Sequence, residues 1–320
     1  MAVRETVRVP SSDGVSSLWV TLWEPEEEPK AVLQLVHGMT EHIGRYEELA
    51  QFLTARGVAV IGHDQLGHGR TAPSRDQLGF FAEHNGAAYL IQDIRRIRHL
   101  AEKRYPQIPG FLLGHSMGSF LVRRYLTRYG KEVDGAVLMG TGDYPAAVLL
   151  AALAAVNLTA LAEWDRCRSR LLHSLVLGNY NRRIPSPRTG SDWLSRDEER
   201  VDQFVRDPYC NFRFSCSAYR DFFHVMLELK SRRVVDRMPR ELPIFLMSGS
   251  EDPVGAYGKG VRRLFRRYQS MGMTDVKIRL YEGSRHEILN DLDRDQVHRD
   301  LTEWIFQQIG KAGEQNSRHI

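Results

Sequence analysis

The sequence Gly114-His115-Ser116-Met117-Gly118 constrains the fold of this 320-residue chain more than any other stretch. An apolar run precedes it, and an apolar-periodic stretch at residues 120–129 follows it. This order predicts a strand, a tight turn and a helix, the context in which Gly-x-Ser-x-Gly presents a nucleophilic serine. Because glycine has no Cβ, the two glycines allow the backbone to crowd Ser116 into a strained turn. The N-terminus of the following helix would lie beneath Ser116 and stabilise negative charge that develops there.

Short apolar runs alternate with amphipathic stretches through the first 143 residues, after a hairpin predicted at 6–9 and 18–23. This alternation predicts βαβ units and an α/β fold with a mostly parallel central sheet flanked by helices. The same pattern resumes near residue 242 and ends in a closing helix at 296–309. The predicted strands lie at 31–36, 58–61, 111–114, 136–139, 242–249 and 277–281, and a long helix lies at 87–105.

Residues 144–240 interrupt this alternation. A run of Ala, Leu and Val at 146–162 is followed by a stretch rich in arginine, acidic and aromatic residues. We therefore expect residues 1–143 and 241–320 to form the core, and 144–240 to form a helical cap over the carboxyl edge of the sheet.

The apolar run at 146–162 is open to three interpretations. It is short for a membrane span, and Asn157 and Thr159 interrupt it. It could pack the cap on the core, or it could form the wall of an acyl-chain site that also touches a bilayer surface.

A nucleophilic serine needs a histidine base and an acid, which follow it in the order Ser, acid, His in this arrangement. Asp252 follows the predicted strand at 242–249, with Glu251 as its rival, and Pro253 restricts the backbone of Asp252. His286 follows the predicted strand at 277–281. The sequence therefore predicts a catalytic triad of Ser116, His286 and Asp252.

An oxyanion hole needs two backbone N–H donors. The first is expected at Met117, directly after the nucleophile. The second is expected in the loop after the strand at 31–36, where Gly38 would allow the turn that aims the N–H of Met39.

These motifs resemble the monoacylglycerol lipase and lysophospholipase branch of the α/β-hydrolase fold, which is often described as serine aminopeptidase-like. The resemblance covers roughly residues 5–310. It implies hydrolysis of carboxylic esters, often of single-chain acylglycerols or lysophospholipids, with neither a metal nor an organic cofactor. The matching segments are 37–42, 64–70, 114–118, 252–254 and 285–290.

The sequence leaves two other functions open. One is an aminopeptidase or amidase, which needs an acidic site for a free amino group. The other is a ligand-binding protein that has lost catalysis, against which the complete Ser-Asp-His order argues.

Composition limits the partners and the compartment. The net charge of +4 is small for this length, so we expect no nucleic-acid partner. The resemblance implies a small-molecule lipid ester as substrate, and the apolar run at 146–162 allows transient contact between the cap and a membrane surface. Three cysteines without a Cys-x-x-Cys pair, and a charged N-terminus without an apolar core, favour a cytoplasmic location, peripheral to a membrane where the cap touches one.

Overall fold

An eight-stranded sheet forms the centre of the protein in a computed structural model that describes residues 3–317, with side chains described from 3 to 311. The strand order is β1-β2-β4-β3-β5-β6-β7-β8. The first two strands pair antiparallel with each other, β2 pairs antiparallel with β4, and the other neighbours are parallel. The strands are β1 Val3–Pro10, β2 Ser17–Glu24, β3 Ala31–Val36, β4 Val58–Asp64, β5 Gly110–His115, β6 Gly135–Met139, β7 Ile244–Gly249 and β8 Val276–Tyr281.

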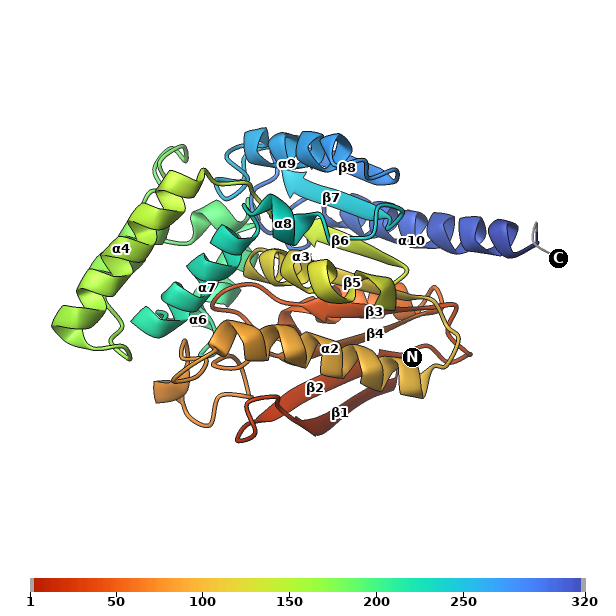
Figure 1. The fold of residues 1–320 in the computed structure, drawn as a ribbon, viewed down its shortest axis with the longest axis horizontal. Coiled ribbons are helices and arrows are strands. Elements are labelled where there is room, and N and C mark those ends of the chain that lie inside the picture. The colour runs from red at the N-terminus through yellow and green to blue at the C-terminus, as the bar shows by residue number, and fades with distance from the viewer. Residues whose placement is uncertain (1–2, 318–320) are drawn as a thin grey trace.

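Helices cover both faces of this sheet (Figure 1). Side chains of α2, α3 and α9 join one apolar core, while α1 and α10 pack into a second core on the opposite face. The central strand β5 contributes side chains to both cores, because Leu112 points into the first and Phe111 and Leu113 point into the second. The bounds are α1 Glu47–Thr54, α2 Gly86–Arg104, α3 Met117–Tyr129, α9 Lys259–Ser270 and α10 Arg294–Ser317.

The predicted mostly parallel α/β architecture is confirmed, and most element ends fall within two residues of the prediction. The closing helix is the main exception, because α10 runs to Ser317 and not to residue 309. A glycine costs a helix only about 1 kcal/mol, so Gly310 and Gly313 do not end α10. Lys311, Ala312, Glu314 and Gln315 in the same stretch are good helix formers.

The segment between β6 and β7, residues 140–243, is helical and is called the inserted segment below. Its helices α4, α6 and α7 lie together beyond one edge of the sheet (Figure 1). The helices of this segment are α4 Ala146–Glu163, α5 Arg170–Leu177, α6 Glu198–Arg206, α7 Cys216–Glu228 and α8 Arg232–Val235.

Helix α4 is apolar on every side, and this decides where it can lie. It buries Leu149, Leu153 and Val156, which recur at helical spacing, but leaves Leu158 68% and Leu161 85% exposed. By length and composition α4 could cross a membrane, and only 17% of its apolar stretch is buried in the protein. The helix therefore has one face on the protein and one apolar face turned outward.

A buried histidine in the sheet makes the stability depend on pH. His63 of β4 is fully buried, and within the described chain neither of its ring nitrogens has a hydrogen-bond partner. Burial, helped by the nearby His68, lowers the pKa of His63 to about 4. The unfolded chain therefore binds more protons than the folded protein below about pH 6.5, and stability falls as the pH falls from there toward 4.

We expect His63→Leu to weaken this pH dependence. At pH 5 the unfolded chain binds a proton at this histidine that the folded protein does not bind. This difference lowers the free energy of unfolding by about 2 kcal/mol, and the substitution removes it. The free energy of unfolding from urea titrations at pH 7.5 and pH 5.0 measures the difference. His84→Leu, at an exposed position, should leave the pH dependence as in the parent protein. An unchanged pH dependence in His63→Leu would contradict this assignment.

Candidate active site

Ser116 lies in a strained turn between β5 and α3. Its φ of 50° and ψ of −120° are unfavourable for a residue with a side chain, and its N–H donates to the carbonyl of Met139 at 2.9 Å. A Cβ on Gly114 would lie 2.5 Å from the oxygen of Gly118, and one on Gly118 would lie 2.1 Å from the oxygen of Val36. Both positions therefore require glycine, as the turn predicted from the sequence demands.

His286 and Asp252 meet although they follow different strands. The Nδ1 atom of His286 lies 2.9 Å from Oδ1 of Asp252, and both side chains are buried. The carboxylate also accepts from the N–H of Val254 at 2.8 Å and from the Ser248 hydroxyl at 3.2 Å. A carboxylate held in this way fixes the proton on Nδ1 of His286 and leaves Nε2 free to accept one.

The rival acid Glu251 lies elsewhere. Its side chain is 47% exposed, and its nearest charged partner is Arg183 at 4.0 Å. Asp252 is thus the acid that the structure places against His286.

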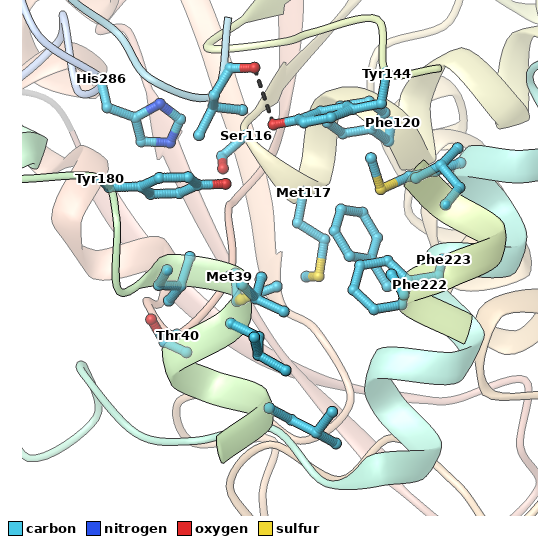
Figure 2. A pocket seen from close by; sticks show the side chains of 18 of the residues that line it. Met39, Thr40, Ser116, Met117, Phe120, Tyr144, Tyr180, Phe222, Phe223 and His286 are labelled. Atoms are coloured by element: carbon cyan, nitrogen blue, oxygen red, sulfur yellow. Dashed lines mark hydrogen bonds between the residues drawn. The ribbon is translucent and has the colours of Figure 1, made fainter. Parts of the chain in front are cut away.

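Ser116 and His286 both line one cavity (Figure 2). The Ser116 hydroxyl, the His286 ring and the Tyr180 hydroxyl point toward the same part of it in Figure 2. The Tyr144 hydroxyl also lies there and donates to the carbonyl of Val254 at 3.0 Å. Burial raises the pKa of Tyr180 to about 12, so its hydroxyl is neutral at physiological pH and is able to donate a hydrogen bond.

The predicted oxyanion donors belong to two segments that lie next to Ser116. Met117 is the first residue of α3, so its N–H has no partner within the helix. The loop after β3 passes very close, since a Cβ on Gly38 would lie 3.1 Å from the Cβ of Ser116. The N–H of Gly38 is used by Glu41 at 2.6 Å, which leaves Met39, whose side chain lines the cavity, as the next donor along the loop.

The cavity has a volume of about 520 Å³, and its wall is mostly apolar. Ser116 and His286 lie at the sheet side, and the inserted segment supplies most of the remaining wall. These apolar residues are Val148, Leu149, Ala151, Ala152, Ala155 and Val156 of α4, Leu172, Leu175, Val176 and Leu177 of α5, and Phe222, Phe223 and Met226 of α7.

Two sets of site residues escaped the sequence reasoning. Trp193 of the inserted segment packs on His286 with ring centroids 4.9 Å apart, and its carbonyl lies 3.4 Å from the N–H of His286. Glu41 forms buried ion pairs with Arg45 and His115 at the cavity wall. A glutamate in the loop that carries the oxyanion donor was the only available signal for the second set.

Two groups of potential metal ligands occur among the described side chains. Ligand atoms of His42, Asp207 and Cys210 lie within 4.8 Å of one another. However, Nδ1 of His42 accepts from the N–H of Gly44 at 3.2 Å, so Nε2 carries the proton and donates to Asp207 at 2.9 Å. A metal would need that Nε2 lone pair, and the contacts therefore fit a hydrogen bond better than a metal site.

The second group contains Glu48, Asp295 and His298. Glu48 already pairs with Arg200 and Arg294, which supply the positive charge that its carboxylate needs.

The sequence matches the family described as serine aminopeptidase, S33, over residues 27–293. It is 30% identical over 292 residues to a monoacylglycerol lipase of Mycolicibacterium smegmatis, covering 90% of this chain and 92% of the relative. It is also 30% identical to a monoglyceride lipase of Rattus norvegicus over 300 residues, covering 92% of this chain and 89% of the relative.

Solved structures show the same fold. A thermostable carboxyl esterase from Bacillus coagulans, in complex with glycerol, superimposes with a TM-score of 0.88 at 28% identity, covering 97% of this chain and all of the other. A soluble variant of the monoglyceride lipase of Saccharomyces cerevisiae gives a TM-score of 0.77 at 21% identity, covering 96% of both chains. The chain therefore belongs to the serine aminopeptidase S33 family and has the α/β-hydrolase fold.

Proposed function

We propose that this serine ester hydrolase cleaves single-chain lipid esters, such as monoacylglycerols or lysophospholipids, through an acyl-enzyme formed on Ser116. One observation carries the proposal: the cavity that holds Ser116 and His286 continues into a mostly apolar wall supplied by α4, α5 and α7. An acyl chain that leaves a micelle or a membrane needs such a wall, because its exposure to water costs about 0.8 kcal/mol for each CH₂ group.

In the proposed mechanism the ester carbonyl binds with its oxygen between the N–H groups of Met39 and Met117. Ser116 attacks the carbonyl carbon while Nε2 of His286 takes the hydroxyl proton, and Asp252 stabilises the resulting imidazolium. The alcohol leaves with a proton from His286. Water then attacks the acyl-enzyme by the same route and releases the fatty acid.

We assign residues 144–240 to a cap that selects the substrate. Its helices supply most of the acyl wall, and its Trp193 packs on His286. The Tyr180 hydroxyl, near Ser116 in Figure 2, is a polar group suited to the alcohol part of the ester.

An aminopeptidase is the second candidate, and the residues that line the cavity argue against this function. Such an enzyme needs a free carboxylate for the α-amino group of its substrate. Among the described cavity-lining residues the acids are Glu41 and Glu287, and both are committed to Arg45.

The outward face of α4 supports contact with a membrane surface. Leu158, Leu161 and Trp164 are 68%, 85% and 71% exposed, and α4 also forms part of the acyl wall. A helix that touches both lipid and cavity would shorten the path of an acyl chain between them. The three cysteines are free thiols, as suits a cytoplasmic enzyme that binds membranes from that side.

We expect Ser116→Ala to abolish hydrolysis of p-nitrophenyl butyrate and of monoacylglycerols, lowering kcat at least 10⁴-fold, because the nucleophile is lost. The protein should fold normally, with an unchanged melting temperature. A fluorophosphonate probe should label the parent enzyme at Ser116 and leave the variant unlabelled. Retention of most esterase activity would refute the mechanism, and absence of labelling in the parent enzyme would favour a non-catalytic protein. Faster cleavage of aminoacyl amides than of esters would favour the aminopeptidase.

Ala155→Phe should shorten the acyl site. Ala155 lines the cavity two to three turns along α4 from its start, so a phenyl ring there would occupy space that a long chain needs. We expect kcat/KM for a 16-carbon acyl ester to fall at least tenfold, while that for a four-carbon ester stays within twofold. Its neighbour Ala154 is exposed and does not line the cavity, so Ala154→Phe should leave the chain-length profile unchanged. Equal losses for both esters in Ala155→Phe would contradict the placement.

The double variant Leu158→Ser/Leu161→Ser should bind phosphatidylcholine vesicles containing monoacylglycerol at least tenfold more weakly, because each leucine contributes about 1.5–3 kcal/mol when buried in lipid. Vesicle co-sedimentation measures this, and hydrolysis of a monomeric soluble ester should be unaffected. Val15→Ser removes an equally exposed apolar side chain from the β1–β2 turn and should leave binding unchanged. Undiminished binding of the double variant would show that α4 is not the contact.

A further inference from the structure

Four ionisable side chains are buried together at one side of the cavity, and three of them, Glu41, His115 and Glu287, form part of its wall. The side chains of Glu41, Arg45, His115 and Glu287 are 3%, 11%, 6% and 5% exposed. Burying charged groups is costly unless they are paired and hydrogen-bonded, and in this cluster each group has a partner within it. The partners belong to segments far apart in the chain, which suggests that the cluster holds these segments in register.

Glu41 fixes the loop that carries the proposed oxyanion donor. Its Oε1 atom accepts from the N–H of Gly38 at 2.6 Å, from the Tyr46 hydroxyl at 3.0 Å and from Nδ1 of His115 at 3.0 Å. Gly38 immediately precedes Met39. The next peptide is held on both sides, because Glu41 accepts from the N–H of Gly38 and Nδ1 of His37 lies 2.8 Å from the carbonyl of Gly38. The direction of the N–H of Met39 therefore depends on the Glu41 carboxylate together with His37.

Arg45 connects this carboxylate to the loop that carries His286. Its Nη1 and Nη2 atoms donate to Oε1 and Oε2 of Glu287 at 2.6 and 2.7 Å, and Nη1 also lies 3.1 Å from Oε2 of Glu41. Glu287 directly follows His286, and its N–H donates to the carbonyl of Leu194 at 2.7 Å. A planar guanidinium that makes two parallel hydrogen bonds fixes both distance and orientation.

The charges of this bridge are stable in the folded protein. Burial alone would lower the pKa of Arg45, but the adjacent Glu287 and Glu41 raise it well above its usual value. Burial alone would raise the pKa of Glu287, but the charge and hydrogen bonds of Arg45 hold it below its usual value. The bridge therefore remains an ion pair throughout the neutral range.

We infer that Arg45 is a positioning residue for ester hydrolysis: by bridging Glu41 and Glu287, it fixes the spacing between the oxyanion donor at Met39 and the base His286. The inference rests on the proposed function. The oxyanion donor acts only when it lies about 2.7–3.1 Å from the developing charge, and a shift of 1 Å in such a group costs about 10²-fold in rate. Arg45 itself has no contact with the reacting atoms in this account and acts through the two loops.

Glu287→Gln is the first test, because it removes one end of the bridge and leaves the Arg45–Glu41 pair charge-balanced. Arg45→Lys is the second, because an ammonium keeps the charge but cannot make the paired bonds. We expect each variant to lower kcat for p-nitrophenyl butyrate about tenfold, with KM within twofold. The affinity of a boronic acid, which mimics the tetrahedral intermediate on Ser116, should fall in parallel with kcat.

Coupling between the two substitutions separates positioning from a general loss of packing. Once Glu287→Gln has severed the bridge, Arg45→Lys should cost little more, so the double variant should lose about tenfold and not a hundredfold. Arg95→Met is the control, since it breaks another bidentate Arg–Glu pair, with Glu132, and neither residue lines the cavity. This control should keep kcat, KM and boronic acid affinity at the parent values.

The outcomes are distinguishable. If the parent protein neither hydrolyses esters nor reacts with a fluorophosphonate, the proposed function fails and the inference with it. If the parent is active but Glu287→Gln and Arg45→Lys stay within threefold of Arg95→Met, the inference alone is overturned. It is also overturned if the losses lie in KM, or if the two substitutions multiply to a hundredfold loss. Circular dichroism melts show which variants are folded, and Glu287→Gln decides the question if Arg45→Lys is not.

Discussion

The site depends on the close crossing of α3 over the carboxyl ends of β3 and β5. Gly118 touches the backbone of Val36, and Gly114 touches the backbone of Gly118, so neither position has room for a Cβ. This contact forces Ser116 into its positive φ and points the start of α3 at the cavity. Gly38, which follows β3, also lies against Ser116, because a Cβ there would be 3.1 Å from the Cβ of Ser116. Ser116 thus lies beside Met117 and beside the loop that carries Met39, the two residues proposed to form the oxyanion hole.

Much of this arrangement could be predicted from the sequence, because it follows from local pattern and parallel topology. Short apolar runs identified the inner strands, and residues that follow parallel strands gather at the same edge of the sheet. For that reason Ser116, Asp252 and His286, which follow β5, β7 and β8, could be expected together although up to 170 residues separate them. Asp252 and Glu251 are neighbours in sequence, but only the fold separates the buried carboxylate from the exposed one.

Contacts between loops and the inserted segment could not be predicted in this way. Trp193 packs on His286, and Arg45 pairs with Glu287. Each pair is far apart in sequence, and the periodic patterns that predict helices and strands do not indicate contacts of this kind. The orientation of α4 could not be predicted for a different reason. Its own residues are apolar on every side, so the sequence pattern does not indicate which face is buried. One face of α4 packs against α7 and lines the cavity. The opposite face is apolar and exposed in the folded chain.

The cluster of Glu41, Arg45, His115 and Glu287 shows how charge is tolerated in the wall of a mostly apolar cavity. Two carboxylates and one guanidinium leave one negative charge, and His115 offsets it when protonated. Burial alone would lower the pKa of His115, but its hydrogen bond to Glu41 outweighs this and raises the pKa above its usual value. An apolar replacement would be cheaper to bury. However, an apolar residue in place of Glu41 would leave the N–H of Gly38 without its acceptor in the interior, which costs about 1–3 kcal/mol. The loop after β3 therefore needs a buried acceptor at this position, and the other charged groups of the cluster compensate the charge that Glu41 brings.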